Sequence, residues 1–334
     1  MINIAIIGYG YWGPNLARNF FELPGCNLKY ICDLHDKNLR KAGEKYPYVK
    51  LTKNYDQILA DNTIDAVAIA TPVSTHFPLA KKFLEAGKNV LIEKPLCTSV
   101  EEAKKLLDIS EKKKKIVSVS HTFLYSPPVI RVKELLDKKT LGRLFYIDSS
   151  RVNLGLFQPD VSVVWDLAPH DASIMIYWLG ETPHAVACHG KSYIRKEIFE
   201  VAYITLFFSK NIVAHLHISW LAPCKLRRTV LIGSKRMAVY DDIEPVEKIK
   251  IYNEGVVKNP ETFGEFQLTY RSGDIISPRL PVAEPLKTEC ADFLESVEKN
   301  KKPKSDITYG VNVVKVLAAA EESAKNRGKI IKIS

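Results

Sequence analysis

The stretch INIAIIGYGYWG, residues 2–13, decides the fold of the first part of this chain. A short apolar strand leads into the pattern G-x-G-x-x-G, and a helix is predicted directly after it, over residues 14–22. The first glycine permits a tight turn, the second lets the backbone approach a pyrophosphate, and the third allows the helix to pack closely on the strand. The stretch therefore predicts a dinucleotide-binding turn. The residues expected to line the cofactor here are Gly8, Gly10, Tyr11, Trp12 and Gly13.

The next predicted strand, residues 28–32, ends in an acid, Asp33, about 20 residues after Gly13. A carboxylate at this place accepts hydrogen bonds from the 2′-hydroxyl of the adenosine ribose and repels a 2′-phosphate. The alternative is that Asp33 caps a helix, and the two roles can coexist. The acid favours NAD over NADP, although Arg40 and Lys41 lie close enough in sequence to leave NADP open.

Strands and helices alternate through residues 1–122, as expected of a doubly wound domain. Six strands joined by right-handed crossovers are expected, which makes the fold class α/β with a Rossmann-type parallel sheet. Beyond the first two strands, the apolar runs predict strands over 64–70, 89–92 and 116–120, and helices over 36–45, 54–60, 76–86 and 99–113.

Two loops that follow predicted strands carry further candidates. Thr71 and Pro72 end the strand 64–70 and are expected on the nicotinamide side of the cofactor site. His76 begins the next helix; we favour that structural role over catalysis and keep His76 as a candidate cofactor contact.

The strand 89–92 ends in Glu93, Lys94 and Pro95. In open α/β sheets ligands lie beyond the carboxyl ends of the strands, which is where Lys94 would sit. A lysine there can hold a substrate hydroxyl or carbonyl by hydrogen bonding, and Pro95 biases Lys94 toward an extended conformation. The alternative is a surface lysine in a loop. Glu93 and Lys94 are also expected to contact the cofactor.

Residues 123–334 predict an α+β domain with a large, mostly antiparallel open sheet. One face of the sheet should pack on helices, and an apolar opposite face would need a partner chain, so we expect a homodimer or homotetramer. Residues 253–284 are interrupted by Gly and Pro and predict a long loop with short strands. The other predicted elements are strands over 144–152, 184–190, 199–208, 211–219, 226–233, 235–241, 247–252 and 329–333, and helices over 127–138, 285–298 and 308–326.

Asp166 and His170 lie four residues apart and share one face if this turn is helical. The dipole of a helix N-terminus opposes added positive charge, which favours the neutral imidazole that a general base needs. The alternative, equally supported by the residues alone, is that Asp166 is only an N-cap and His170 a packed helix residue. Asp171 is expected to orient a neighbouring group or to cap the helix, and not to react.

Composition narrows the class of protein. Apolar residues make up 46% and charged residues 26% of the 334, as in ordinary globular proteins. No apolar run is long enough to span a membrane and the N-terminus enters a strand at once, so we expect a cytoplasmic protein. The six cysteines show no metal-ligand spacing, and no metal is expected. The net charge of +10 comes without aromatic–basic interleaving, which favours an anionic small molecule over nucleic acid.

Together these features resemble the Gfo/Idh/MocA family, named after glucose–fructose oxidoreductase, inositol dehydrogenase and a rhizopine-catabolism protein. The resemblance is carried by the glycine turn, by ATPVSTH at 70–76, by AGKNVLIEKP at 86–95 and by D-x-x-x-H at 166–170. The family usually has D-x-G-x-H after a run of glycines, whereas this chain has Ala168 and the residues SVVW at 162–165. That departure leaves the acid and the histidine in place. The chain is similar to the branch found with nucleotide-sugar and polysaccharide biosynthesis.

The resemblance implies an NAD-dependent sugar oxidoreductase. In it, His170 takes the hydroxyl proton while hydride passes to the nicotinamide, Lys94 hydrogen-bonds the same oxygen, and Asp166 contacts the substrate. Lys94 and His170 fall in different predicted domains, so the site would need both. The alternatives are an inositol or free-sugar dehydrogenase and, in another class, a non-catalytic dinucleotide-sensing regulator, against which the presence of both residues argues.

Further substrate contacts are expected from side chains outside these motifs. Arg151 and Asn153 alternate along the chain that leads to Asp166, and Arg151 could pair with a substrate carboxylate or phosphate. A structural ion pair is the equally supported alternative for Arg151. His121 and Tyr125 are candidates for the sugar pocket, and Gln158 is a weaker one.

Overall fold

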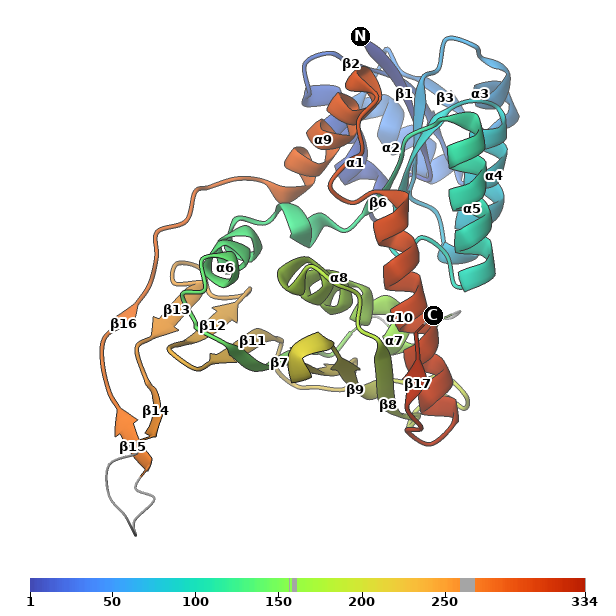
Figure 1. The fold of residues 1–334 in the computed structure, drawn as a ribbon. Helices are drawn as coiled ribbons and strands as arrows, with labels where there is room; N and C mark the ends of the chain where they lie inside the picture. The colour runs from blue at the N-terminus through green and yellow to red at the C-terminus, as the bar shows by residue number, and fades with distance from the viewer. Residues whose placement is uncertain (156, 158–160, 259–267, 334) are drawn as a thin grey trace. The chain divides into compact units, whose positions relative to one another are not determined.

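A computed structural model describes residues 1–155, 157, 161–258 and 268–333 of the chain. The chain divides into two compact units, coloured in sequence order in Figure 1. The first unit comprises Met1–Tyr125 and Ala283–Lys315, and the second comprises Ser126–Val282 and Val316–Ser334. The division expected at residue 122 places residues 283–315 with the later part of the chain, whereas contacts in the structure group them with the first unit.

The first unit is built on a six-stranded sheet in the order β3-β2-β1-β4-β5-β6. All neighbouring strands run parallel, so the predicted α/β class is confirmed. Apolar runs in the sequence place five of these strands. The sixth, β3, has three residues of which only Thr52 is buried, so hydrophobicity does not mark it. The strands are β1 (Ile2–Ile7), β2 (Cys26–Cys32), β3 (Lys50–Thr52), β4 (Ala66–Ile69), β5 (Asn89–Glu93) and β6 (Val117–Ser120).

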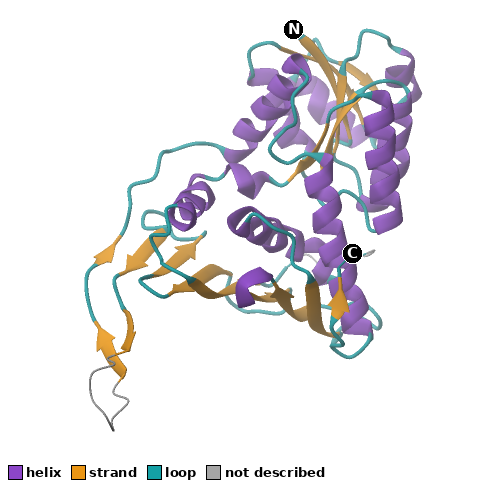
Figure 2. Cartoon of the chain, viewed as in Figure 1, coloured by secondary structure: helices purple, strands orange, loops and turns teal. Residues whose placement is uncertain are grey.

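Helices cover the sheet of the first unit, as Figure 2 shows. One face packs Ile4 and Ile6 of β1 against Phe20 and against Phe293, which belongs to the late helix α9. Helices α4 and α5 pack on each other, and α4 also contacts β4 and β5. The helices are α1 (Gly13–Glu22), α2 (Asp36–Lys45), α3 (Asp56–Ala60), α4 (His76–Glu85), α5 (Val100–Lys113) and α9 (Pro285–Lys299), with 3₁₀ turns η1 (Val73–Thr75) and η2 (Thr122–Tyr125).

The second unit holds a nine-stranded sheet in the order β16-β13-β12-β11-β7-β10-β9-β8-β17. Its neighbours are antiparallel except β7 and β10, which run parallel, so the predicted mostly antiparallel sheet is confirmed. Within residues 253–284, the described part contains two hairpin strands and a short edge strand. The strands of this unit are β7 (Leu144–Val152), β8 (Ala185–Lys191), β9 (Val201–Phe207), β10 (Val213–Ser219), β11 (Leu226–Gly233), β12 (Met237–Asp241), β13 (Ile249–Tyr252), β14 (Gly255–Lys258), β15 (Leu268–Arg271), β16 (Ile275–Ile276) and β17 (Ile331–Lys332).

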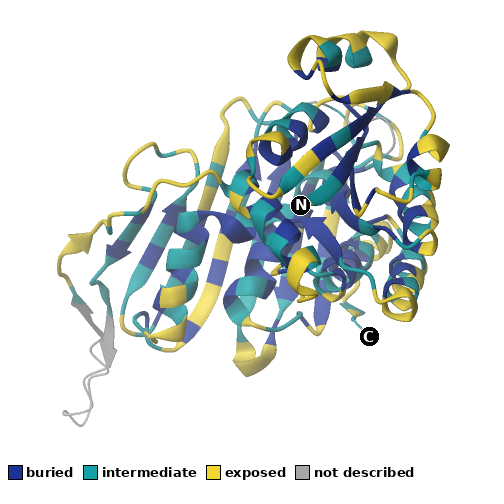
Figure 3. Cartoon of the chain, turned by 90° about the horizontal axis from the view of Figure 1, so that it is seen from above, coloured by how far each residue is buried: buried dark blue, intermediate teal, exposed yellow. Residues whose placement is uncertain are grey.

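Burial alternates along the central strands of this sheet, as Figure 3 shows by colour. The helices α7 and α8 contact β10 on the covered side. The more exposed side carries Tyr203, whose ring stacks on His217 with centroids 4.5 Å apart. The remaining helical segments are α6 (Pro127–Asp137), α7 (Val163–Asp166), α8 (Ala168–Leu179), η3 (Ser209–Asn211) and α10 (Ile307–Lys325). Among the described residues, no helix combines the length and apolar character that a membrane span requires.

Candidate functional site

The glycine turn between β1 and α1 meets the backbone requirements that its sequence predicts. Gly8 has φ +93°, and a Cβ there would lie 2.6 Å from the carbonyl oxygen of Ala70. A Cβ at Gly13 would lie 2.1 Å from the carbonyl oxygen of Gly8, so helix and strand approach too closely for any side chain. A Cβ at Gly10 would meet no protein atom within 4 Å, which leaves open space for a ligand against this backbone.

Tyr11 and Trp12 project from the same turn. Both rings are exposed and meet edge to face with centroids 5.6 Å apart. Trp12 occupies the N-cap position of α1, which begins one residue earlier than predicted, at Gly13. These aromatic rings are accessible to a ligand bound at the turn.

Asp33 follows β2 and ties the glycine turn to the next loop. Its Oδ2 accepts from the backbone N–H of Tyr9 at 2.6 Å, and its Oδ1 accepts from the N–H of His35 at 2.8 Å and from Nδ2 of Asn38 at 3.1 Å. The N-cap of α2 is His35, so Asp33 does not occupy the cap position considered from the sequence. The carboxylate is held rigidly where a ribose would approach the end of β2.

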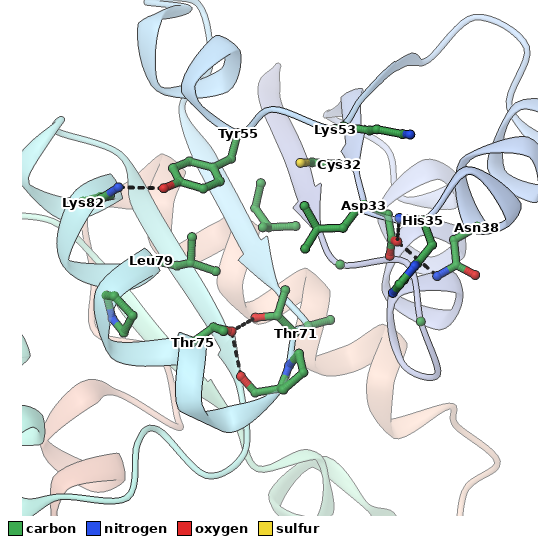
Figure 4. A pocket seen from close by; sticks show the side chains of 17 residues that line it. Cys32, Asp33, His35, Asn38, Lys53, Tyr55, Thr71, Thr75, Leu79 and Lys82 are labelled. Carbon is green, nitrogen blue, oxygen red and sulfur yellow. Dashed lines mark hydrogen bonds between the residues drawn. The ribbon is translucent and has the colours of Figure 1, made fainter. Parts of the chain in front are cut away.

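A cavity of about 580 Å³ lies beside this turn, within the first unit. Its walls come from the glycine turn, the end of β2 and the loop after β4, and its volume falls in the usual range for ligand pockets of roughly 300–1,000 Å³. Figure 4 shows Asp33 on one side and Tyr55 on another, where Lys82 Nζ donates to the phenol oxygen at 2.6 Å. Sequence reasoning missed Tyr55 and Lys82: Tyr55 is the N-cap of α3, Lys82 lies within α4, and neither belongs to a motif.

The loop after β4 is braced by its own hydroxyl groups. Thr75 Oγ1 donates to the carbonyl oxygen of Pro72, 2.7 Å away, and lies 2.6 Å from Oγ1 of Thr71. His76 starts α4 and is buried, with Nδ1 2.8 Å from the carbonyl oxygen of Pro95 and Nε2 2.9 Å from that of Thr71. His76 therefore links the loops that follow β4 and β5, and at least one ring nitrogen must donate because carbonyl oxygens only accept.

These residues fit NAD. The two glycines whose Cβ positions are blocked form a cradle for a pyrophosphate, the cavity has the right size for the adenosine half, and the fixed Asp33 carboxylate suits a ribose hydroxyl. A 2′-phosphate would meet the same carboxylate at a repulsive distance. The Asp33 carboxylate thus favours NAD over NADP.

Lys94 follows the last residue of β5, as predicted, and the peptide bond between Lys94 and Pro95 is cis. Lys94 is half-buried, and its backbone N–H donates to Oε2 of Glu93 at 3.2 Å. Glu93 itself is buried, and burial raises the pKa of its carboxyl to about 7, against the opposing influence of the Lys94 charge. Glu93 is therefore a buried neighbour of Lys94.

His121 and Tyr125 are enclosed within the first unit. Burial, together with the Lys94 charge, lowers the pKa of His121 to about 3, and neither ring nitrogen has a hydrogen-bond partner among the described residues. The Tyr125 hydroxyl donates to Oδ2 of Asp292 at 2.8 Å. Neither side chain presents a free polar atom at an open surface, so their predicted role in a sugar pocket has no direct support in this geometry.

Asp166 and His170 lie on two successive short helical segments of the second unit. Asp166 ends α7, and Leu167 separates it from α8, which contains His170 in its first turn. Asp166 Oδ2 accepts from Nε1 of Trp220 at 3.0 Å, a contact that no sequence pattern pointed to. Asp166 is thus oriented by Trp220, the residue directly after β10, and the N-cap of α8 is Leu167.

Arg151 and Asp171 form a buried ion pair in the second unit. Nε of Arg151 donates to Oδ2 of Asp171 at 2.6 Å, and the Ser149 hydroxyl donates to Oδ1 at 3.0 Å. This is the structural alternative that the sequence left open for Arg151, and it uses the guanidinium within the unit. Asn153 lies just beyond β7 and is half-buried, while Gln158 lies outside the described residues.

No group of three His, Cys, Asp or Glu side chains able to hold a metal occurs in the described part of the chain. Two carboxyl groups do meet, however: Glu289 of α9 reaches the side chains that surround Glu93. Sequence reasoning missed Glu289, although a charge between Leu286 and Phe293 on an apolar helix face is a signal that could have marked it.

Comparisons with known proteins cover both units. Residues 2–121 match the family model described as oxidoreductase family, NAD-binding Rossmann fold, and residues 129–239 match that of the GFO/IDH/MocA C-terminal domain. An uncharacterized oxidoreductase of Escherichia coli (strain K12) is 26% identical over 98% of each chain. The UDP-N-acetylglucosamine 3-dehydrogenase of Acidithiobacillus ferrooxidans is 26% identical over 94% of each.

Solved structures show the same fold. GenD2 from gentamicin A biosynthesis, crystallised in complex with NAD, has a TM-score of 0.83 and 20% identity, covering 100% of this chain and 96% of that chain. At that identity the likeness concerns the fold alone.

Proposed function

Because the chain belongs to the Gfo/Idh/MocA family of NAD-binding oxidoreductases, we propose that it transfers hydride between NAD and a secondary alcohol or ketone of a nucleotide sugar. The observation that carries the proposal is the position of Lys94. Lys94 follows the carboxyl end of β5. The glycine turn, which lines the cavity, follows β1 of the same parallel sheet. The likeness to a UDP-N-acetylglucosamine dehydrogenase supports the substrate class.

NAD supplies the hydride acceptor when it is bound. In the proposed reaction, Lys94 donates a hydrogen bond to the oxygen of the reacting carbon and stabilises the negative charge that develops on it. His170 accepts the hydroxyl proton as general base, and returns it in the reverse direction. Asp166, oriented by Trp220, contacts a substrate hydroxyl.

Cofactor binding is assigned to the first unit. The backbone of the glycine turn holds the pyrophosphate and Asp33 the adenosine ribose. Thr71 and Pro72 lie toward the nicotinamide, and His76 supports them through the carbonyl oxygen of Thr71. Tyr11 and Trp12 flank the turn as exposed aromatic contacts.

We also propose that the chain self-associates through the more exposed side of the sheet in the second unit. Tyr146 and Tyr203 are each nearly half exposed there, at 48% and 45%. Aromatic groups on a sheet surface are typical of interfaces. Light scattering on the wild type and on Tyr203→Glu tests this: the variant should have a lower molar mass, and a monomeric wild type would contradict it.

Turnover measurements test the proposed reaction. Purified protein is mixed with NAD and, separately, with UDP-N-acetylglucosamine, myo-inositol or glucose, and the absorbance of reduced nicotinamide is followed. The nucleotide sugar should turn over fastest; faster reaction with myo-inositol or glucose would favour an inositol or free-sugar dehydrogenase.

A pair of lysine variants tests the role of Lys94 on whichever substrate reacts. Lys94→Ala should lower turnover by roughly 10²-fold or more, the scale of losing a proton-transfer or oxyanion partner. Lys105→Ala is the matched control, because Lys105 is an exposed lysine paired with Glu101 on α5. Equal turnover in the two variants would rule out the role proposed for Lys94.

A further inference from the structure

Two carboxyl groups and two hydroxyl groups meet inside the first unit, next to Lys94. Oγ of Ser120 lies 3.1 Å from Oε1 of Glu93 and 3.1 Å from Oε2 of Glu289. Oγ1 of Thr122 lies 2.8 Å from the same Oε2 of Glu289. Glu289 reaches this place because α9 returns to the first unit from the far end of the chain.

Burial excludes two negative charges in this cluster. Glu289 is fully buried and Glu93 is 7% exposed, and like charges in one buried site raise each other's cost of ionisation. Burial raises the pKa of both carboxyls, and the Glu93 charge raises that of Glu289 further. At least one carboxyl therefore carries a proton.

The surrounding charges decide which carboxyl that is. Glu93 adjoins Lys94 in the chain, and the positive charge of Lys94 lowers the pKa of Glu93 against the effect of burial. Glu289 faces Glu93 and Asp292, both acidic, while its other titratable neighbours, Tyr125 and Cys290, are held neutral by burial. The anion is favoured beside Lys94 and the neutral acid at Glu289.

The hydrogen count requires that one of the two carboxyls be protonated. Each hydroxyl has one hydrogen, so Ser120 can donate to only one of the two carboxyls and must accept from the other. The contacts of the two hydroxyls with the carboxyls are satisfied if Thr122 donates to Glu289, Glu289 to Ser120 and Ser120 to Glu93. They are equally satisfied with Glu93 as the acid, so the surrounding charges and the contacts of the carboxyl oxygens make the choice. Oε1 of Glu289 has no partner among the described residues, which a neutral carbonyl oxygen tolerates better than a carboxylate.

We propose that, at mildly alkaline pH, Glu289 is a protonated carboxylic acid that fixes Glu93 as an anion through Ser120, and that Glu93 is the positioning residue for Lys94. The part that concerns Lys94 rests on the proposed function; the location of the proton does not. Glu93 acts on the reaction only through Lys94 and need not touch substrate.

Infrared spectroscopy tests the location of the proton in the full-length protein. At mildly alkaline pH the wild type should show the carbonyl stretch of one protonated carboxyl group. Glu289→Gln should abolish this band, whereas Glu93→Gln and the control Glu295→Gln, a partly exposed glutamate on the same helix, should retain it. A wild type without the band, or a band lost in Glu93→Gln but kept in Glu289→Gln, would overturn the proposal.

Chemical labelling tests the positioning of Lys94 without a substrate. Acetic anhydride is added at mildly alkaline pH, and acetylation of Lys94 is read by peptide mass spectrometry. Glu93→Gln should speed labelling by about two- to fivefold, the range set by ion-pair energies of partly exposed groups, because the ammonium form loses its nearby anion. Glu289→Gln, a neutral mimic of the protonated acid, should label like the wild type. Equal acceleration of labelling in both variants would contradict the assignment of the anion to Glu93 and of the proton to Glu289.

The two readouts separate this inference from the proposed function. Retained turnover in Lys94→Ala would remove the catalytic role of Lys94 while the infrared result still locates the proton. Conversely, loss of turnover in Lys94→Ala with an infrared band insensitive to Glu289→Gln would leave the proposed function standing and refute the inference.

Discussion

The side chains of Arg151 and Asp171 form a buried ion pair, with Nε 2.6 Å from Oδ2 and no more than 5% of either side chain exposed. Removing one partner of such a pair leaves an uncompensated buried charge. Asp171→Leu should therefore lower the free energy of unfolding by about 3–5 kcal/mol, measured by urea denaturation. Lys133→Met, which breaks the more exposed pair with Asp137, should cost less than about 1 kcal/mol. Comparable losses in the two variants would contradict this account.

The same pair changes what is expected of Arg151. A guanidinium that binds a substrate anion would, on substitution by Ala, mainly raise KM. If the guanidinium is held by Asp171 instead, substitution of Arg151 by Ala should mainly lower the free energy of unfolding. The residues alone left a structural ion pair and a substrate contact as equal alternatives for Arg151. Sequence alone could not tell that Asp171, 20 residues later, pairs with Arg151.

Trp220 orients Asp166 through one hydrogen bond, Nε1 to Oδ2 at 3.0 Å. Trp220→Phe keeps most of the ring volume and removes the donor, so the carboxylate should lose its fixed orientation. We expect kcat/KM to fall by about tenfold, the scale of 1.5 kcal/mol for a hydrogen bond to a charged group. Steady-state kinetics should show this with unchanged affinity for NADH; a loss of NADH affinity would point instead to general damage.

Local patterns predicted the first sheet and the glycine turn because their causes are local. Buried strands, glycines without room for a Cβ and the Ser99 cap of α5, which accepts from the N–H of Glu102, all depend on residues close in sequence. The strand β3 was not predicted because it is short and mostly exposed. Glu289 and Trp220 were missed for a different reason: each acts on a residue more than 50 positions away, and one sequence carries no record of such contacts.

Asp33 should govern the choice of cofactor. Asp33→Asn removes the negative charge but keeps the size of the side chain, so it should weaken NADH binding by about tenfold, the scale of one charge-assisted hydrogen bond, and reduce discrimination against NADPH. Fluorescence titration with both cofactors measures this. Asp36→Asn is the control, because Asp36 is an exposed neighbour paired with Lys53. An unchanged ratio of NADH to NADPH affinity in Asp33→Asn would contradict the role given to this carboxylate.

The free energy of unfolding should depend on pH because the carboxyl of Glu93 is buried. The pKa of Glu93 is raised from 4.5 to about 7 in the folded chain, so between these values the folded state holds a proton that the unfolded state has released. The stabilisation is complete below 4.5 and is lost as pH rises through 7. A pKa rise from 4.5 to about 7 corresponds to a stabilisation of about 3 kcal/mol.

Glu93→Gln cannot titrate, so the unfolding free energy of the wild type should fall relative to this variant by about 3 kcal/mol between about pH 5 and about pH 8. Glu295→Gln serves as control, because Lys299 and Lys301 lower the pKa of Glu295 to about 2 and its contribution is constant above 4.5. Urea denaturation at several pH values gives all three curves. A gap between wild type and Glu93→Gln that stays constant with pH would mean that Glu93 titrates normally, and the charge arrangement around Lys94 would have to be redrawn.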